Sequence, residues 1–118
     1  MAAGADGAAG TSDSLAIARR FVTARREARA LEAFPGDLPD DLAQAYAIQD
    51  AAIGLWPEEI AGWKVGRIPP EHEAVLHEQR LCGPIFRSLV QQAGSEPSVF
   101  SVIDGGFAAV EALSLIHI

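Results

Sequence analysis

The sequence is poor in cysteine and in basic residues. Its single cysteine, Cys82, excludes an internal disulfide framework and a cysteine-rich zinc site. Nine lysines and arginines stand against sixteen acidic residues, which gives a net charge of −7. A surface this acidic repels phosphate backbones, so nucleic-acid binding is not expected. Five arginines between Arg19 and Arg29 are a local exception, interpreted as the solvated face of a helix.

Long apolar runs are also missing. No stretch approaches the roughly 18 residues of a membrane span, and the N-terminus lacks the basic start and apolar segment of a signal peptide. We therefore expect a cytoplasmic protein that does not bind membranes. The 118 residues, 49% of them hydrophobic, favour one folded domain over intrinsic disorder.

The common catalytic motifs are absent as well. The sequence contains no P-loop, no Gly-x-Gly-x-x-Gly and no Gly-x-Ser-x-Gly. His72 and His77 are five positions apart, so on a helix they diverge and do not form the zinc-protease pair. Cys82 has no partner nearby in the sequence and is interpreted as a small packed residue rather than a nucleophile.

The first half of the chain has helical patterns. Residues 1–12 are mostly small and are expected to form a flexible tail. Apolar residues then recur at helical spacing and predict a helix over 13–31. A second helix is expected to begin near Pro39, because proline suits the first helical turn, and to end before Pro57. Residues 13–57 are thus predicted to be a helical N-terminal part.

Strand patterns dominate after residue 57. The expected elements are a strand over 60–66, a short helix over 71–78, an extended segment over 83–86 and β-rich segments over 99–103 and 107–113. Helices followed by strands indicate an α+β fold. Residues 58–112 are therefore interpreted as the start of a β-rich domain. That domain looks unfinished, because a new strand opens only a few residues before the sequence ends.

Lys64 is the first residue that suggests chemistry. It lies inside the predicted strand over 60–66, which is short, apolar and bordered by glycines. One interpretation is an exposed lysine at a strand edge. The other is a cation held against an anionic substrate, because glycines on both sides let a ligand approach the backbone closely.

Glu111 is the second such residue. It is the single acid in the otherwise apolar stretch 107–113. A lone buried carboxylate is costly unless it is paired or bound to a cation, which makes Glu111 a candidate metal ligand. The alternative is a strand with one face in water.

Five segments, taken in order, resemble one known family. They are Phe34-Pro35-Gly36 with Leu38-Pro39, Ala45-Tyr46-Ala47-Ile48-Gln49-Asp50, Gly62-Trp63-Lys64-Val65-Gly66, Gly83-Pro84-Ile85-Phe86 and Gly105-Gly106-Phe107-Ala108-Ala109-Val110-Glu111. The series resembles the 2-keto-4-pentenoate hydratase family, within the fumarylacetoacetate hydrolase superfamily, over residues 13–112. The most specific part is Gly-Trp-Lys-Val-Gly following Ala-Tyr-x-x-Gln-Asp.

The resemblance implies a lyase of aromatic-compound degradation. Such a hydratase adds water to a 2-hydroxy-2,4-dienoate, a small anionic substrate, and yields a 4-hydroxy-2-oxo acid. The family's strand lysine matches Lys64, which implies a catalytic role. Its Mg²⁺ or Mn²⁺ is held by a Glu-x-Glu pair and a third acid; Glu111 matches the first of the pair, but Leu113 stands where the second is expected. A fumarylacetoacetate-hydrolase-like β-rich domain and a homo-oligomer are implied for the complete protein.

The last residues, 113–118, depart from the family's pattern. They match a reading frame of a transposon-derived sequencing adaptor, so we expect a truncated gene and a non-native tail. The chain as given is then expected to be inactive and poorly folded. Two alternatives stay open: a related 2-oxo acid decarboxylase of the oxalocrotonate type, and a non-catalytic partner protein if the chain is natively this short.

Overall fold

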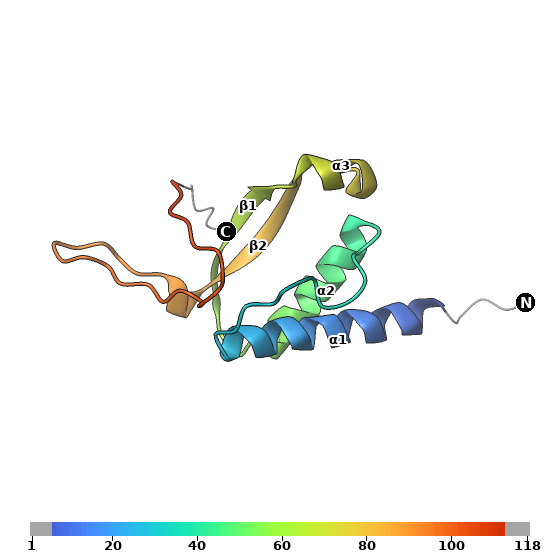
Figure 1. Cartoon of the computed structure of the whole chain (residues 1–118), viewed down its shortest axis with the longest axis horizontal. Helices are drawn as coiled ribbons and strands as arrows, with labels where there is room; N and C mark the ends of the chain where they lie inside the picture. The colour runs from blue at the N-terminus through green and yellow to red at the C-terminus, as the bar shows by residue number, and fades with distance from the viewer. Residues whose placement is uncertain (1–5, 113–118) are drawn as a thin grey trace, which may run out of the picture.

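The computed structural model describes residues 6–112, with side chains from residue 13 onward. Over this range the chain has an α+β fold of three helices and a two-stranded antiparallel sheet, which confirms the predicted class. The elements are α1 (Asp6–Arg26), α2 (Leu42–Leu55), β1 (Ile60–Arg67), α3 (Pro70–Leu76) and β2 (Arg80–Phe86), followed by a 3-10 turn over Arg87–Leu89. Figure 1 shows α1 and α2 side by side, the β1–β2 hairpin rising from them and α3 at its tip. Among residues 6–112, none of the helices combines the length and the hydropathy of a membrane-spanning segment.

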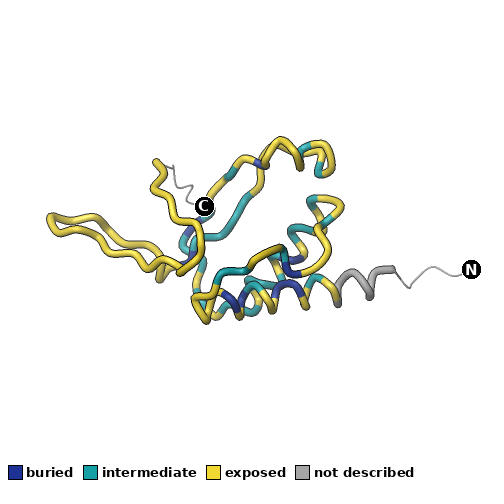
Figure 2. The backbone as a smooth tube through the Cα atoms, in the orientation of Figure 1, coloured by how far each residue is buried: buried dark blue, intermediate teal, exposed yellow. Residues whose placement is uncertain are grey.

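A small apolar core joins α1 to α2. Ile17, Ala18 and Ile48 are buried at its centre, and partly buried Phe21, Phe34, Ala51, Ala52 and Leu55 surround them. Gly36 allows the loop before α2 to approach α1, because a Cβ at this position would lie only 2.7 Å from Ile17 Cγ1. In Figure 2 the buried residues gather on the helices and at the lower end of the hairpin.

The ends of α1 differ from the sequence prediction. The helix begins at Asp6, well before residue 13, and stops at Arg26 rather than near residue 31. It stops there because Ala28 takes a left-handed conformation with φ of 49°, and the Arg29 N–H donates to the Ala24 carbonyl at 2.8 Å. This arrangement normally uses glycine, so the sequence carries no signal for it.

The second helix also begins later than expected. Pro39 lies before α2, which starts at Leu42. Asp41 is the N-cap residue, and its carboxylate accepts a hydrogen bond from the Gln44 N–H at 2.8 Å. The acidic side chain therefore satisfies a free backbone donor at the helix start.

The hairpin confirms the strand predicted over 60–66 and extends the segment predicted over 83–86. The two strands pair from Arg67 opposite Arg80 to Ile60 opposite Phe86, with an irregularity between Ile60 and Gly62. The connection contains α3, which corresponds to the helix predicted over 71–78. Ile68 and Gln79 lie at the two ends of this connection. Ile68 is almost fully buried, and its N–H donates to the Gln79 carbonyl at 2.9 Å.

Trp56, just after α2, links the helix pair to the hairpin. Its ring centroid lies 5.8 Å from that of Phe86. The Arg25 guanidinium stands over both rings, 5.1 Å from Trp56 and 5.7 Å from Phe86, and Arg26 donates to the Leu55 carbonyl at 2.8 Å. These two arginines hold the end of α1 against α2 and the hairpin, so they do more than form the solvated face predicted from sequence.

The β-rich segments predicted over 99–103 and 107–113 form no strand within the described chain. An isolated bridge joins Asp104 to Arg29, and every residue from 91 to 112 is exposed (Figure 2). The physical reason is that a strand needs a neighbouring edge to pair with, and this segment meets none. Residues 1–5 of the predicted tail, and Leu113 with the rest of the predicted non-native tail, lie outside the described residues.

Candidate functional site

Lys64 lies on an open face of the hairpin. It is the only lysine in the sequence, and its side chain is exposed on β1. Its partner on β2 is Gly83, and directly opposite residues share a face. No atom lies within 4 Å of the place where a Cβ would stand at Gly83 or at Gly66. Because Lys64 forms no ion pair with residues 13–112, the hairpin offers an unpaired cation on a glycine-bordered face.

The opposite face of the hairpin is turned toward the helices. The half-buried Trp63 pairs with Pro84, and Phe86, two positions further along β2, packs on Trp56. Side chains alternate along a strand, so Lys64 lies on the other face from Trp63, as the sequence predicts. The hairpin therefore separates a packing face from a face that is open to a ligand.

Two side chains of α2 contact the backbone of β2 at Cys82. The Cys82 N–H donates to Tyr46 Oη at 3.0 Å, and Gln49 Nε2 donates to the Cys82 carbonyl at 2.9 Å. Tyr46 and Gln49 are three positions apart on α2, so they project from the same side of the helix. The free thiol of Cys82 is half-buried, but the contact with α2 uses its backbone.

The sequence assigns no role to this pair, although both residues belong to the Ala-Tyr-x-x-Gln-Asp segment that carries the resemblance. A usable signal was present: Tyr46 and Gln49 bring hydrogen-bonding groups to a helix whose other residues are mostly apolar. On a half-buried helix such groups need partners. What the pattern lacks is the identity of the partner, which is 36 positions away for Tyr46 and 33 for Gln49.

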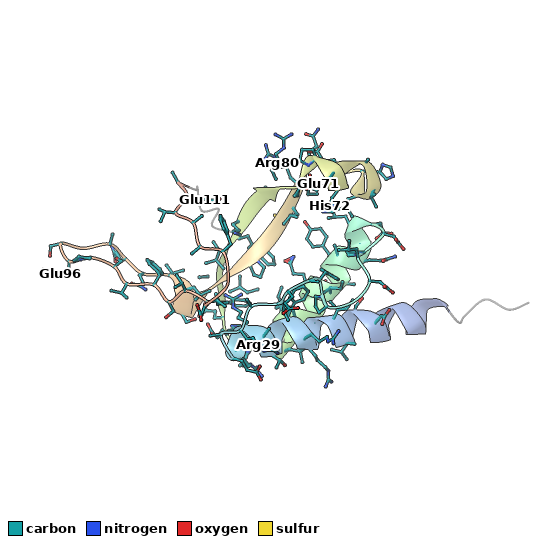
Figure 3. The ribbon with its side chains drawn as sticks, in the orientation of Figure 1. Arg29, Glu71, His72, Arg80, Glu96 and Glu111 are labelled. Carbon is teal, nitrogen blue, oxygen red and sulfur yellow. The ribbon has the colours of Figure 1, made fainter. Side chains whose placement is uncertain are left out.

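Glu111, the predicted metal ligand, lies on the C-terminal segment with an exposed side chain (Figure 3). Within the described residues no three His, Cys, Asp or Glu side chains are grouped so that they could hold a metal ion. A hard divalent cation takes several oxygen ligands, so the described residues do not by themselves make a Mg²⁺ or Mn²⁺ site. Metal binding at Glu111 stays a prediction.

His72 and His77 lie at the far tip of the hairpin. His72 is an exposed residue of α3, and His77 is the exposed C-cap residue of that helix, with φ of 54° (Figure 3 labels His72). Arg67 of β1 forms an ion pair with Glu73 at 3.5 Å, which ties α3 to the strand. The polar residues of α3 therefore surround the tip rather than the face that carries Lys64.

No family model matches this chain, and neither a curated protein nor a solved structure does.

Proposed function

We propose that these residues are the N-terminal part of a metal-dependent hydratase that adds water to a 2-hydroxy-2,4-dienoate. The proposal follows the resemblance to the 2-keto-4-pentenoate hydratase family. The observation that carries it is the environment of Lys64, an unpaired cation on a face that Gly66 and Gly83 leave open. A flat conjugated acid requires both features: a positive charge for its oxygens and free space along the backbone.

Lys64 would act by stabilising negative charge. When the dienoate takes up water, electron density builds on the oxygen next to the carboxylate as that part of the substrate passes through an enolate. A cation already in place at this oxygen lowers the barrier, because no reorganisation is needed when the charge develops. The same cation would hold the substrate's carboxylate, so Lys64 contributes to binding as well as to turnover.

Glu111 is the only described residue that we assign to the metal site. We propose that Glu111 supplies one oxygen ligand to Mg²⁺ or Mn²⁺ and that the remaining ligands come from outside the described residues. The same holds for a fumarylacetoacetate-hydrolase-like β-rich domain and for assembly into a homo-oligomer. This part of the proposal is supported by the resemblance alone, and the 118-residue chain is expected to show no turnover.

The decisive experiment measures the activity of the complete protein. The source gene is sequenced beyond Ala112, the complete protein is expressed, and hydration of 2-hydroxypenta-2,4-dienoate is measured with Mg²⁺. Lys64→Ala should lower kcat/KM by about 10²–10³-fold, the loss typical of one preorganised group at developing charge. Arg80→Ala is the matched control, because Arg80 is an exposed cation of the same hairpin that pairs with Arg67 at the end next to α3. Unchanged kinetics in Lys64→Ala would show that Lys64 is an ordinary strand-edge lysine with no catalytic role.

Two further measurements refine the result. Oxalocrotonate offered to the same protein distinguishes the decarboxylase alternative, since release of CO₂ without hydration would assign that reaction instead. Calorimetry with Mg²⁺ compares Glu111→Gln with Glu96→Gln, a second exposed acid of the C-terminal segment. Only Glu111→Gln should weaken binding, because the amide loses the charge that a hard cation needs. Equal affinities would remove Glu111 from the site.

A further inference from the structure

The contact between α2 and Cys82 is incompatible with a shift of β2 by one residue. Cys82 directs both its N–H and its carbonyl to α2, so both point away from β1. Along a strand this direction alternates, so the neighbours of Cys82 direct theirs toward β1. If β2 moved by one residue along α2, the groups facing Tyr46 and Gln49 would turn to the other edge and both hydrogen bonds would be lost. The two side chains therefore oppose any one-residue shift of β2 along the helix.

Lys64 is connected to this contact through Gly83. Gly83 follows Cys82 on β2 and is the residue that pairs with Lys64 across the hairpin. The helix that supplies the contact is itself held against α1, because Ile48 is buried in the core between the two helices. We propose that Tyr46 and Gln49 are positioning residues that determine where Lys64 lies relative to the helix pair. This inference rests on the function proposed for Lys64.

A feature of Gln49 separates positioning from stability. Its Oε1 atom is buried and has no hydrogen-bond partner in the described structure. A buried carbonyl oxygen without a partner is destabilising, so removing the unpaired Gln49 Oε1 gains stability, and this gain offsets the cost of leaving the partly buried Cys82 carbonyl without its donor. Gln49→Met removes the hydrogen bond to Cys82 and the unpaired oxygen at once. We expect this variant to keep its unfolding midpoint while losing the contact.

The experiment uses Lys64 as the only lysine of the 118-residue chain. An amine-reactive nitroxide is attached to it, and the broadening of each backbone amide signal of α2 is recorded by NMR. Lys64→Arg protein treated in the same way carries the label only at the N-terminal amine and supplies the background. Tyr46→Phe and Gln49→Met should each change the broadening pattern along α2. Asp50→Asn, an exposed neighbour on the same helix, should leave the pattern as it is.

Hydrogen exchange gives the second measurement. The Cys82 amide should exchange about tenfold faster in Tyr46→Phe, the ratio that corresponds to one net hydrogen bond. An unchanged broadening pattern in both variants would overturn the proposal even if this amide exchanges faster, because Lys64 would then keep its place without the contact. A lower unfolding midpoint for Gln49→Met would overturn it too, since Gln49 would be a stabilising residue. Unchanged turnover in Lys64→Ala removes the proposed function and leaves the broadening results unaffected, so the two failures are distinguishable.

Discussion

The folded region, residues 13–86, and the C-terminal segment, residues 91–112, contain similar residue types but differ in burial. All the buried hydrophobic residues among those described lie between Ile17 and Phe86, whereas every residue of the segment 91–112 is exposed. That segment nevertheless contains Val99, Phe100 and Phe107, which are residue types that favour strands. Strand propensity without a neighbouring edge therefore does not make a strand.

The two strands of the hairpin form because each has a backbone partner close to it. One short connection joins β1 to β2, and α2 occupies the outer edge of β2 at Cys82. The C-terminal segment has an isolated bridge to Arg29 and a turn in which the Gly106 N–H donates to the Ile103 carbonyl at 3.0 Å. Gly105 permits that turn through its φ of 72°. Such local contacts bend the backbone but leave no residue of the segment buried, and even Ile103 stays 39% exposed.

The largest expected difference between the two regions comes from a pair of phenylalanines. Phe86 is 5% exposed and packs on Trp56, whereas Phe107 is 96% exposed. Phe86→Ala should cost about 3–5 kcal/mol of unfolding free energy through lost burial and the cavity that remains. Phe107→Ala should cost nothing measurable. Urea unfolding followed by the near-ultraviolet signal of the tryptophans checks both, and equal costs would show that the C-terminal segment is packed as well.

A pair of glycines gives the next effect. Gly36→Ala places a Cβ 2.7 Å from Ile17 Cγ1, so the core must shift, and we expect a loss of roughly 1–3 kcal/mol. Gly94→Ala meets no atom within 4 Å and serves as the control. Thermal unfolding of the two variants is compared with that of the unchanged chain. Similar midpoints for Gly36→Ala and Gly94→Ala would contradict the close approach of the loop to α1.

The start of α2 provides a smaller effect. Asp41→Ala removes the side-chain hydrogen bond to the Gln44 N–H and should cost about 1 kcal/mol. Ser98→Ala, an exposed polar residue of the C-terminal segment, is the comparison variant and should be neutral. Far-ultraviolet circular dichroism during urea unfolding measures the helical loss. A neutral Asp41→Ala would mean that α2 does not depend on this cap.

The smallest effect on stability is expected from the largest change to the chain, the removal of the C-terminal segment. Ending the chain after Val90 removes the exposed segment, and the unfolding midpoint should change little because no residue of that segment is buried. Self-association, measured by sedimentation velocity, should decrease, since Val99, Phe100 and Val110 no longer face water. A lower midpoint after this deletion would show that the C-terminal segment stabilises the folded region.

Much of the folded region follows from sequence patterns that act over a few residues. The helical spacing of apolar residues predicts α1 and α2, and alternation predicts β1 with Lys64 on the opposite face from Trp63. The ends are less predictable. Ala28 closes α1 in a conformation usually given to glycine, and Asp41 shifts the start of α2 past Pro39. Both depend on hydrogen bonds that form only when the flanking chain has already turned.

Local sequence patterns therefore predict the helices, the hairpin strands and a lysine on the opposite face from Trp63, because each of these depends on neighbours within one or two turns of the chain. The contact of Tyr46 and Gln49 with the backbone of Cys82, and the lack of a strand over 99–103, become visible only in the folded chain. In both cases the outcome depends on a backbone partner far away in the sequence. Residue type states what a group can bond to, and folding decides whether a partner is within reach.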